Sequence, residues 1–257
     1  MLIASSSRPL STVRISLPSG ARTQIGIFLF AYLLYSAARW LTIGDLGTAK
    51  ANAGWIVDLE QNLGVASEAA VQDGLTGTWV LWLLNHLYLA AQLVVLPGAL
   101  YVLYRTSRTA YTRLRNTILA TWVLSIPVYA LFPVAPPRLA GLGMVDTITQ
   151  QTGFALDSKV TTTFYNELAA VPSLHVGFAF AIGIAIAAAS GNRLVKVLAH
   201  LWGPTIALAV VATGNHYVFD IAAGMVAAAV GYGLGHLASR AGSLRLSLPA
   251  RGRPALG

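Results

Sequence analysis

The stretch TWVLWLLNHLYLAAQLVVLPGALYVL, residues 78–103, contains no charged side chain. A helix of about 20 mostly apolar residues crosses the hydrocarbon core of a bilayer, so this stretch predicts a membrane span. Five other stretches share this character. Together they predict spans over residues 23–42, 78–103, 117–135, 172–190, 197–213 and 218–237. The fold class we expect is an all-α integral membrane protein, a bundle of six transmembrane helices.

The composition agrees with a membrane protein. Of the 257 residues, 56% are hydrophobic and 10% are charged, whereas soluble domains carry about 25% charged residues. The net charge is +8, but the cations lie between the apolar stretches and not along one stripe. They therefore indicate membrane topology and contact with anionic lipids, and not a nucleic-acid partner. There are no cysteines, which excludes disulfides and thiolate metal sites.

The distribution of cations predicts an orientation. All but four of the 17 Lys and Arg residues fall on the side of the two termini; the exceptions are Arg39, Lys50, Arg138 and Lys159. Because cytoplasmic loops carry the excess of Lys and Arg, we expect both termini in the cytoplasm of a multi-pass cell-membrane protein. The expected organisation is a mobile basic cytoplasmic tail (1–21), a six-span membrane domain (22–238) and a second basic cytoplasmic tail (239–257).

The segment between the first two spans is too polar to cross a bilayer. In it, Trp55, Ile56, Leu59 and Leu63 recur at helical spacing. This spacing predicts an amphipathic helix on the extracytoplasmic face, with an ordinary helix packed on the bundle as the alternative. The long loop that follows the third span is of a kind that often carries function.

Polar residues gather at the extracytoplasmic ends of three spans. VPSLHVGFAF (171–180) places His175 in the first turn of the fourth span, and GNHYVFDIAAG (214–224) places His216 and Asp220 where the fifth span meets the sixth. Arg138 follows the third span on the same face. Ser173 has the residue type of a helix N-cap, and the amides behind it would form an anion site.

These residue types suit phosphoryl transfer. If helical, His216 and Asp220 share a face at i, i+4, so the carboxylate can hold one imidazole nitrogen and leave the other as a nucleophile. His175 can serve as the acid, and the Arg138 guanidinium suits a phosphate. Two alternatives stay open: a zinc site formed by the histidines and the aspartate, and a transporter that uses the His–Asp pair as a proton relay.

The motifs APPR (135–138), PSLH (172–175) and HYVFDIAAG (216–224) resemble those of the type 2 phosphatidic acid phosphatase superfamily. The likeness is greater to its inositol phosphorylceramide synthase and sphingomyelin synthase branch. The resemblance implies that His216 is the nucleophile, Asp220 its orienting partner and His175 the acid for the leaving group. It also implies that Arg138 and Ser173 bind the phosphate.

The chain departs from the commoner phosphatases of that superfamily. They carry Lys and Pro where this chain has Leu131 and Leu139, and Ser-Arg where it has Ala209 and Val210. Similar losses occur in the sphingolipid-synthase branch, which passes the phosphoryl group to an alcohol. This favours a transferase, and a phosphatase that uses Arg138 and Lys159 as its cations stays open.

The function predicted is therefore a membrane-embedded lipid phosphotransferase or lipid phosphatase that works through a phosphohistidine at the outer leaflet. Its substrate would be a lipid phosphate or phosphodiester, with an alcohol as the possible acceptor and no metal or other cofactor. The lipid, the acceptor and the oligomeric state are left open, as are the roles of Asn85, His86, Gln92 and Lys159. The three side chains inside the second span are candidates either for the site or for hydrogen bonds between spans.

Overall fold

A computed structural model describes residues 19–41, 45–164 and 166–247. Residues 1–18 and 248–257 of the predicted terminal tails lie outside these residues, whereas residues 19–21 and 239–247 are helical. By its contacts the chain forms two compact units, one up to Leu34 and one from Tyr35 onward. The first holds most of helix α1 (Ser19–Leu41), and the second holds every other element described below.

The regular secondary structure of the described residues is helical, and they form no strand beyond one isolated bridge. Four helical stretches in this part of the chain are long and apolar enough to cross a membrane, as expected of a multi-pass membrane protein; they cover Trp79–Thr106, Arg108–Leu131, Arg193–Ala212 and Val218–Leu237. Helix α10 (Leu174–Ala189), at the fourth predicted span, is apolar but has only 16 residues. The six-span arrangement stays a prediction.

The first of these stretches consists of α4 (Trp79–Ala90), a π-helical turn η1 (Ala91–Val95) and α5 (Leu96–Thr106). The others are α6 (Arg108–Leu131), α11 (Arg193–Ala212) and α12 (Val218–Ser247). Helix α6 begins nine residues before the predicted span because Ser107 caps it, accepting the amide of Ala110. The predicted span left out these nine polar, Arg-rich residues because they are too polar for a bilayer. They are helical nonetheless, because a capped helix can form outside the bilayer.

The long helices pack closely at glycines. Helix α10 lies against α11, α12 and α6. A Cβ atom placed on Gly177 of α10 would lie 2.7 Å from the carbonyl oxygen of Gly224 on α12, and one placed on Gly224 would meet the backbone of Ser173. Small residues allow such close approach between membrane helices. These two glycines bring the start of α10 next to the start of α12.

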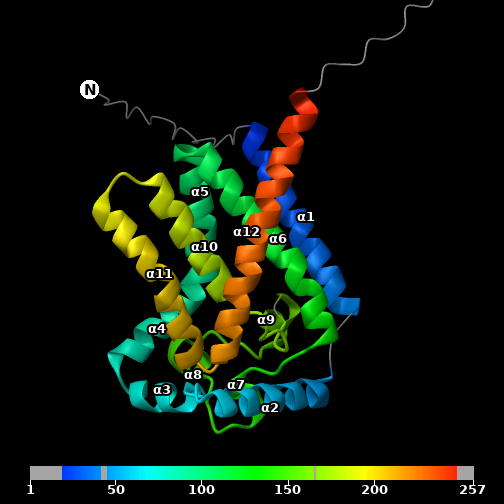
Figure 1. Cartoon of the computed structure of the whole chain (residues 1–257). Coiled ribbons are helices and arrows are strands. Elements are labelled where there is room, and N and C mark those ends of the chain that lie inside the picture. Colours follow the sequence, from blue (N-terminus) through cyan, green and yellow to red (C-terminus); the bar gives the residue numbers. More distant parts are fainter. Residues whose placement is uncertain (1–18, 42–44, 165, 248–257) are drawn as a thin grey trace, which may run out of the picture. The chain divides into compact units, whose positions relative to one another are not determined.

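Shorter helices gather at this end of the bundle. Figure 1 shows α2 (Leu46–Leu63) and α3 (Glu68–Leu75) running across the end where α11 meets α12, next to α7 (Pro137–Ala140) and α8 (Thr147–Thr152). Helix α9 (Lys159–Phe164) follows in the same loop.

The structure places a helix where the amphipathic helix was predicted, but the residues of the expected stripe do not all face one way. The buried face of α2 consists of Ala49, Ala53, Ile56 and Glu60. Trp55, a member of the expected stripe, is mostly exposed, although its ring edge meets Phe132 and Phe219. Residues of the protein therefore cover one face of α2, and that face carries a glutamate.

Candidate active site

The imidazole of His216 is held at one nitrogen. Its Nδ1 lies 3.1 Å from Asp220 Oδ2 and 2.9 Å from the carbonyl oxygen of Ala170. Both partners are acceptors, so Nδ1 carries the hydrogen, and in the neutral imidazole Nε2 is the nitrogen with the lone pair. His216 precedes the first residue of α12, and Asp220 lies in that helix's first turn. The two side chains are in contact, as the i, i+4 spacing predicted, although only Asp220 lies inside the helix.

Asp220 also organises the start of its own helix. Its Oδ2 accepts the amide of Tyr217 at 2.9 Å, which is the reciprocal half of a capping box. The carboxyl group is fully buried. One oxygen therefore fixes both the imidazole and the backbone that carries it, so a change at Asp220 would disturb both.

His175 lies close to His216. The two ring centroids are 6.1 Å apart and their planes are inclined by 59°. On its other side the ring of His175 stacks on Tyr88 of α4, with centroids 4.1 Å apart. The stacking fixes the plane of the imidazole, so His175 is held in position next to His216.

Ser173 caps α10 as predicted. Its Oγ accepts the amide of Val176, and the side chain is fully buried. Its own amide donates to the carbonyl oxygen of Asp220 at 3.2 Å. This main-chain hydrogen bond fixes the N-terminus of α10, which carries His175, against the first turn of α12. The N-terminus of a helix attracts anions, so the general physics of helices is compatible with the phosphate contact expected for Ser173.

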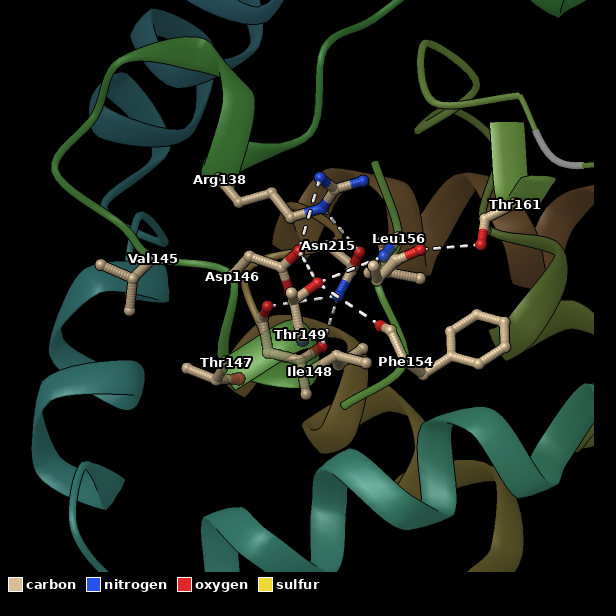
Figure 2. Close-up of polar contacts among 12 residues, drawn as sticks. Arg138, Val145, Asp146, Thr147, Ile148, Thr149, Phe154, Leu156, Thr161 and Asn215 are labelled. Atoms are coloured by element: carbon tan, nitrogen blue, oxygen red, sulfur yellow. Dashed lines mark hydrogen bonds and ion pairs between the residues drawn. The ribbon is translucent and has the colours of Figure 1, made fainter. Parts of the chain in front are cut away.

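Arg138 joins the same assembly through the turn that ends α11. Its amide donates to the carbonyl oxygen of Gly214, and its Nε donates to Asn215 Oδ1 at 3.0 Å, one residue before His216. Its guanidinium, in a side chain only 1% exposed, also lies 3.9 Å from Asp146. Figure 2 shows the Arg138 side chain with Asn215 and Asp146. A bound phosphate would therefore share Arg138 with Asp146.

Sequence reasoning missed Asp146 and Asn215. Asp146 caps α8 by accepting both the amide and the hydroxyl of Thr149, so the loop that carries it is ordered locally (Figure 2). Asn215 binds Thr213 with its amide group, which leaves its oxygen for Arg138. One available signal was the position of Asn215, directly before the proposed nucleophile.

Buried amide side chains anchor the loop that contains α8. Asn85, in the second predicted span, accepts the hydroxyl of Thr147 at 2.8 Å and donates to Gln151 at 2.9 Å. Gln72 of α3 bonds both backbone groups of Val145 and also the carbonyl oxygen of Ala212. Asn85 therefore supports the loop behind Arg138. His86 bonds only the carbonyl oxygen of Trp82, one turn earlier in its own helix.

Two glutamates hold the first turn of α12 from outside. Glu60 of α2 accepts the amide of Phe219 at 2.6 Å, and Glu68 of α3 accepts the amide of Val218 at 2.8 Å. These amides have no partner inside the helix. Burial, the neighbouring Glu68 carboxyl and the charge of Asp220 raise the pKa of Glu60 from 4.5 to about 8. Burial and the same three carboxyl groups raise the pKa of Tyr217 well above its usual range.

Main-chain contacts connect the three motifs. The hydroxyl of Tyr217 donates to the carbonyl oxygen of Ala135 at 3.0 Å. Residues Val134 and Ala169 form a short parallel bridge, one residue before the carbonyl of Ala170 that accepts from His216. The APPR, PSLH and HYVFDIAAG segments are thus connected mostly through backbone groups.

The positions that depart from the commoner phosphatases offer no further cation. Leu131 ends α6 with 85% of its surface exposed, and Ala209 and Val210 are fully buried in α11. Lys159 is exposed at the start of α9.

No curated protein matches the sequence. Among solved structures, the crystal structure of Aquifex aeolicus LpxE matches with 16% identity and a TM-score of 0.48, covering 66% of this chain and 92% of that one. This similarity is too low to carry an argument. The family model of the PAP2 superfamily matches residues 54–234, which is more than half of the chain and includes all five predicted site residues. The chain therefore belongs to the PAP2 superfamily.

Proposed function

We propose that this protein is a membrane-embedded enzyme that transfers the phosphoryl group of a lipid phosphate or phosphodiester through a phosphohistidine on His216. The observation that carries the proposal is the close placement of two imidazoles, one of which is held at Nδ1. Nδ1 of His216 is committed to Asp220 and Ala170, and His175 faces it across 6.1 Å. Membership of the PAP2 superfamily supports a phosphatase-type reaction.

In the first step, Nε2 of His216 attacks phosphorus as the bond to the leaving oxygen breaks. His175 donates a proton to that oxygen, and the new P–N bond leaves a positive imidazole that Asp220 stabilises. Arg138, the Ser173 hydroxyl and the first amides of α10 would hold the phosphoryl oxygens. Positioning and charge stabilisation supply most of the catalysis in such transfers.

In the second step, His175 takes a proton from the acceptor, whose oxygen attacks phosphorus and releases His216. If water is the acceptor, the enzyme is a phosphatase; if an alcohol is the acceptor, it is a phosphotransferase. The lack of a cation at positions 131 and 210 favours transfer, as in the sphingolipid-synthase branch that the motifs resemble. The reaction would take place at the extracytoplasmic face, where the positive-inside rule puts these residues.

The experiment is incubation of the purified protein with ³²P-labelled lipid phosphates and phosphodiesters, with and without candidate alcohols. We expect labelled product, and rapid quenching should leave label on the peptide that contains His216. His216→Ala should abolish turnover, His175→Ala should nearly abolish it, and EDTA should have no effect. Full activity of His216→Ala would refute the nucleophile, and loss with EDTA that zinc restores would establish the metal alternative. Ion flux across proteoliposomes without any phosphoryl product would favour the transporter.

A further inference from the structure

The first turn of α12 is capped by three carboxyl groups, and two of them come from elsewhere in the chain. Asp220 takes the amide of Tyr217, Glu68 takes that of Val218 and Glu60 takes that of Phe219. The last two bonds join residues 150 and 159 positions apart. The capped turn lies between His216 and the body of α12, so its position decides where the imidazole lies.

Glu60 and Glu68 are buried as a pair. Glu60 is 1% exposed and Glu68 is 8% exposed. Both carboxyl oxygens of Glu68 accept a main-chain amide, Oε1 from Val218 and Oε2 from Ser67. Among the described residues, Glu60 Oε2 has no hydrogen-bond donor, and no ion pair joins either group to a Lys or Arg. Two adjacent buried acids without a cation share a proton more readily than they both ionise.

From this arrangement we propose that Glu60 and Glu68 are positioning residues for phosphoryl transfer: by accepting the amides of Phe219 and Val218 they hold the first turn of α12, and so hold His216 and Asp220 in the reactive geometry, with Glu60 in its protonated form. The inference rests on the proposed function. Among the described residues, neither glutamate forms a hydrogen bond with His175 or His216, so both act through the first turn of α12. Helices α2 and α3, which cover the end of the bundle, would thus support the site by carrying the two glutamates.

The charges around Glu60 make the pair sensitive to pH. Glu68 faces it from α3, Asp220 from α12 and Tyr217 from the turn before α12. Helix α7 also packs on α2, and its Arg138 is engaged by Asp146 and Asn215. Ionisation of Glu60 would place three carboxylates around one helical turn. Their repulsion would loosen the turn, with a midpoint near pH 8, the pKa of Glu60.

The test compares Glu60→Gln, Glu60→Ala and the wild type, with Asp58→Asn as the control on the exposed side of α2. Glutamine mimics the protonated acid, since its oxygen can accept from Phe219 and its amide can donate to Glu68. We expect kcat of the wild type to fall above pH 8 with KM nearly constant. Glu60→Ala should lose about 100-fold in kcat, the cost of misplacing a reacting group by about 1 Å. Glu60→Gln should keep most of the wild-type kcat, and its kcat should not fall above pH 8. Asp58→Asn should behave as the wild type.

A second measurement needs no activity. Hydrogen exchange of the Val218 and Phe219 amides should be about fivefold faster in Glu60→Ala, as expected for the loss of one hydrogen bond of ordinary net strength. It should be near the wild-type rate in Glu60→Gln. If the wild type transfers phosphate but Glu60→Gln keeps the alkaline fall, the positioning role is wrong and the proposed function stands. If the wild type is inactive, the proposed function fails, and unchanged exchange in Glu60→Ala would separately overturn the positioning role.

Discussion

Replacing Gly177 with alanine adds one methyl group at the point where α10 crosses α12. The new Cβ would lie 2.7 Å from the carbonyl oxygen of Gly224 and 3.3 Å from Cβ of Ala228. The first contact is to a backbone atom, which cannot rotate away as a flexible side chain can. The two helices must therefore move apart.

The size of the movement follows from the contact distance. Ordinary contact begins at 3.4 Å, so the helices would separate by about 0.7 Å at this level. Helix α10 carries His175 and its cap Ser173, and α12 carries Asp220. Because misplacing reacting groups by about 1 Å costs about 100-fold, we expect kcat to fall by about tenfold or more. Overpacking of this kind also destabilises by about 1–3 kcal/mol, offset by the ~0.5–1 kcal/mol that alanine gains over glycine in a helix.

The assay is phosphoryl release or transfer in detergent micelles, read as kcat and KM, with thermal unfolding measured on the same samples. Gly233→Ala is the matched control, since it lies in α12 with no atom within 4 Å of the added methyl group. We expect Gly233→Ala to keep full activity and to gain slightly in stability. Wild-type kcat and unfolding temperature in Gly177→Ala would show that the close approach of the helices does not position the site.

Two further outcomes follow from buried polar groups outside the reacting space. Asn85→Ala would leave Thr147 and Gln151 without their partner, so we expect the unfolding free energy to fall by about 1–3 kcal/mol. We also expect weaker substrate binding, because the loop behind Arg138 would be less well held. His86→Ala, tested in parallel, should change neither the stability nor the binding. Because the folded state raises the pKa of Glu60 from 4.5 to about 8, the folded protein keeps a proton that the unfolded chain releases. The unfolding free energy of the wild type, relative to that of Glu60→Gln, should therefore fall as pH rises from 4.5 to 8, by at most about 1.4 kcal/mol per pH unit, and change no further above pH 8. Thermal melts of both proteins at pH 5, 6.5 and 8 measure this difference. The same pH dependence in both proteins would contradict the prediction.

The sequence predicted which polar residues lie close together better than it predicted the bounds of the helices. His175 and Ser173 fall at the start of one apolar stretch, and His216 and Asp220 fall at the start of another, so hydropathy alone put them at one level of the bundle. Their distances could not be predicted, because these depend on how closely α10 and α12 approach. Gly177 and Gly224 decide that approach, and only the folded partner shows which glycines of the Ala-rich spans make contact.

The supporting residues escaped prediction for a different reason. Glu60 lies off the apolar stripe expected for α2, so its residue type indicated a solvated face. It is buried because the amides of α12 meet it there, a contact between residues 159 positions apart. Asp146 likewise sits in a loop without periodicity, and only its distance to Arg138 reveals its role. Long-range hydrogen bonds leave no local pattern in a sequence.

The contacts of Ala135 and Ala170 with the residues around His216 have an evolutionary consequence. Each contributes only its carbonyl oxygen, to Tyr217 and to His216 respectively. Every residue type carries that group, so another small side chain could occupy either position and the same bond would form. Both side chains are buried in an apolar cluster, so selection at these two places acts on volume, on apolar character and on the course of the chain, and any small apolar residue would serve.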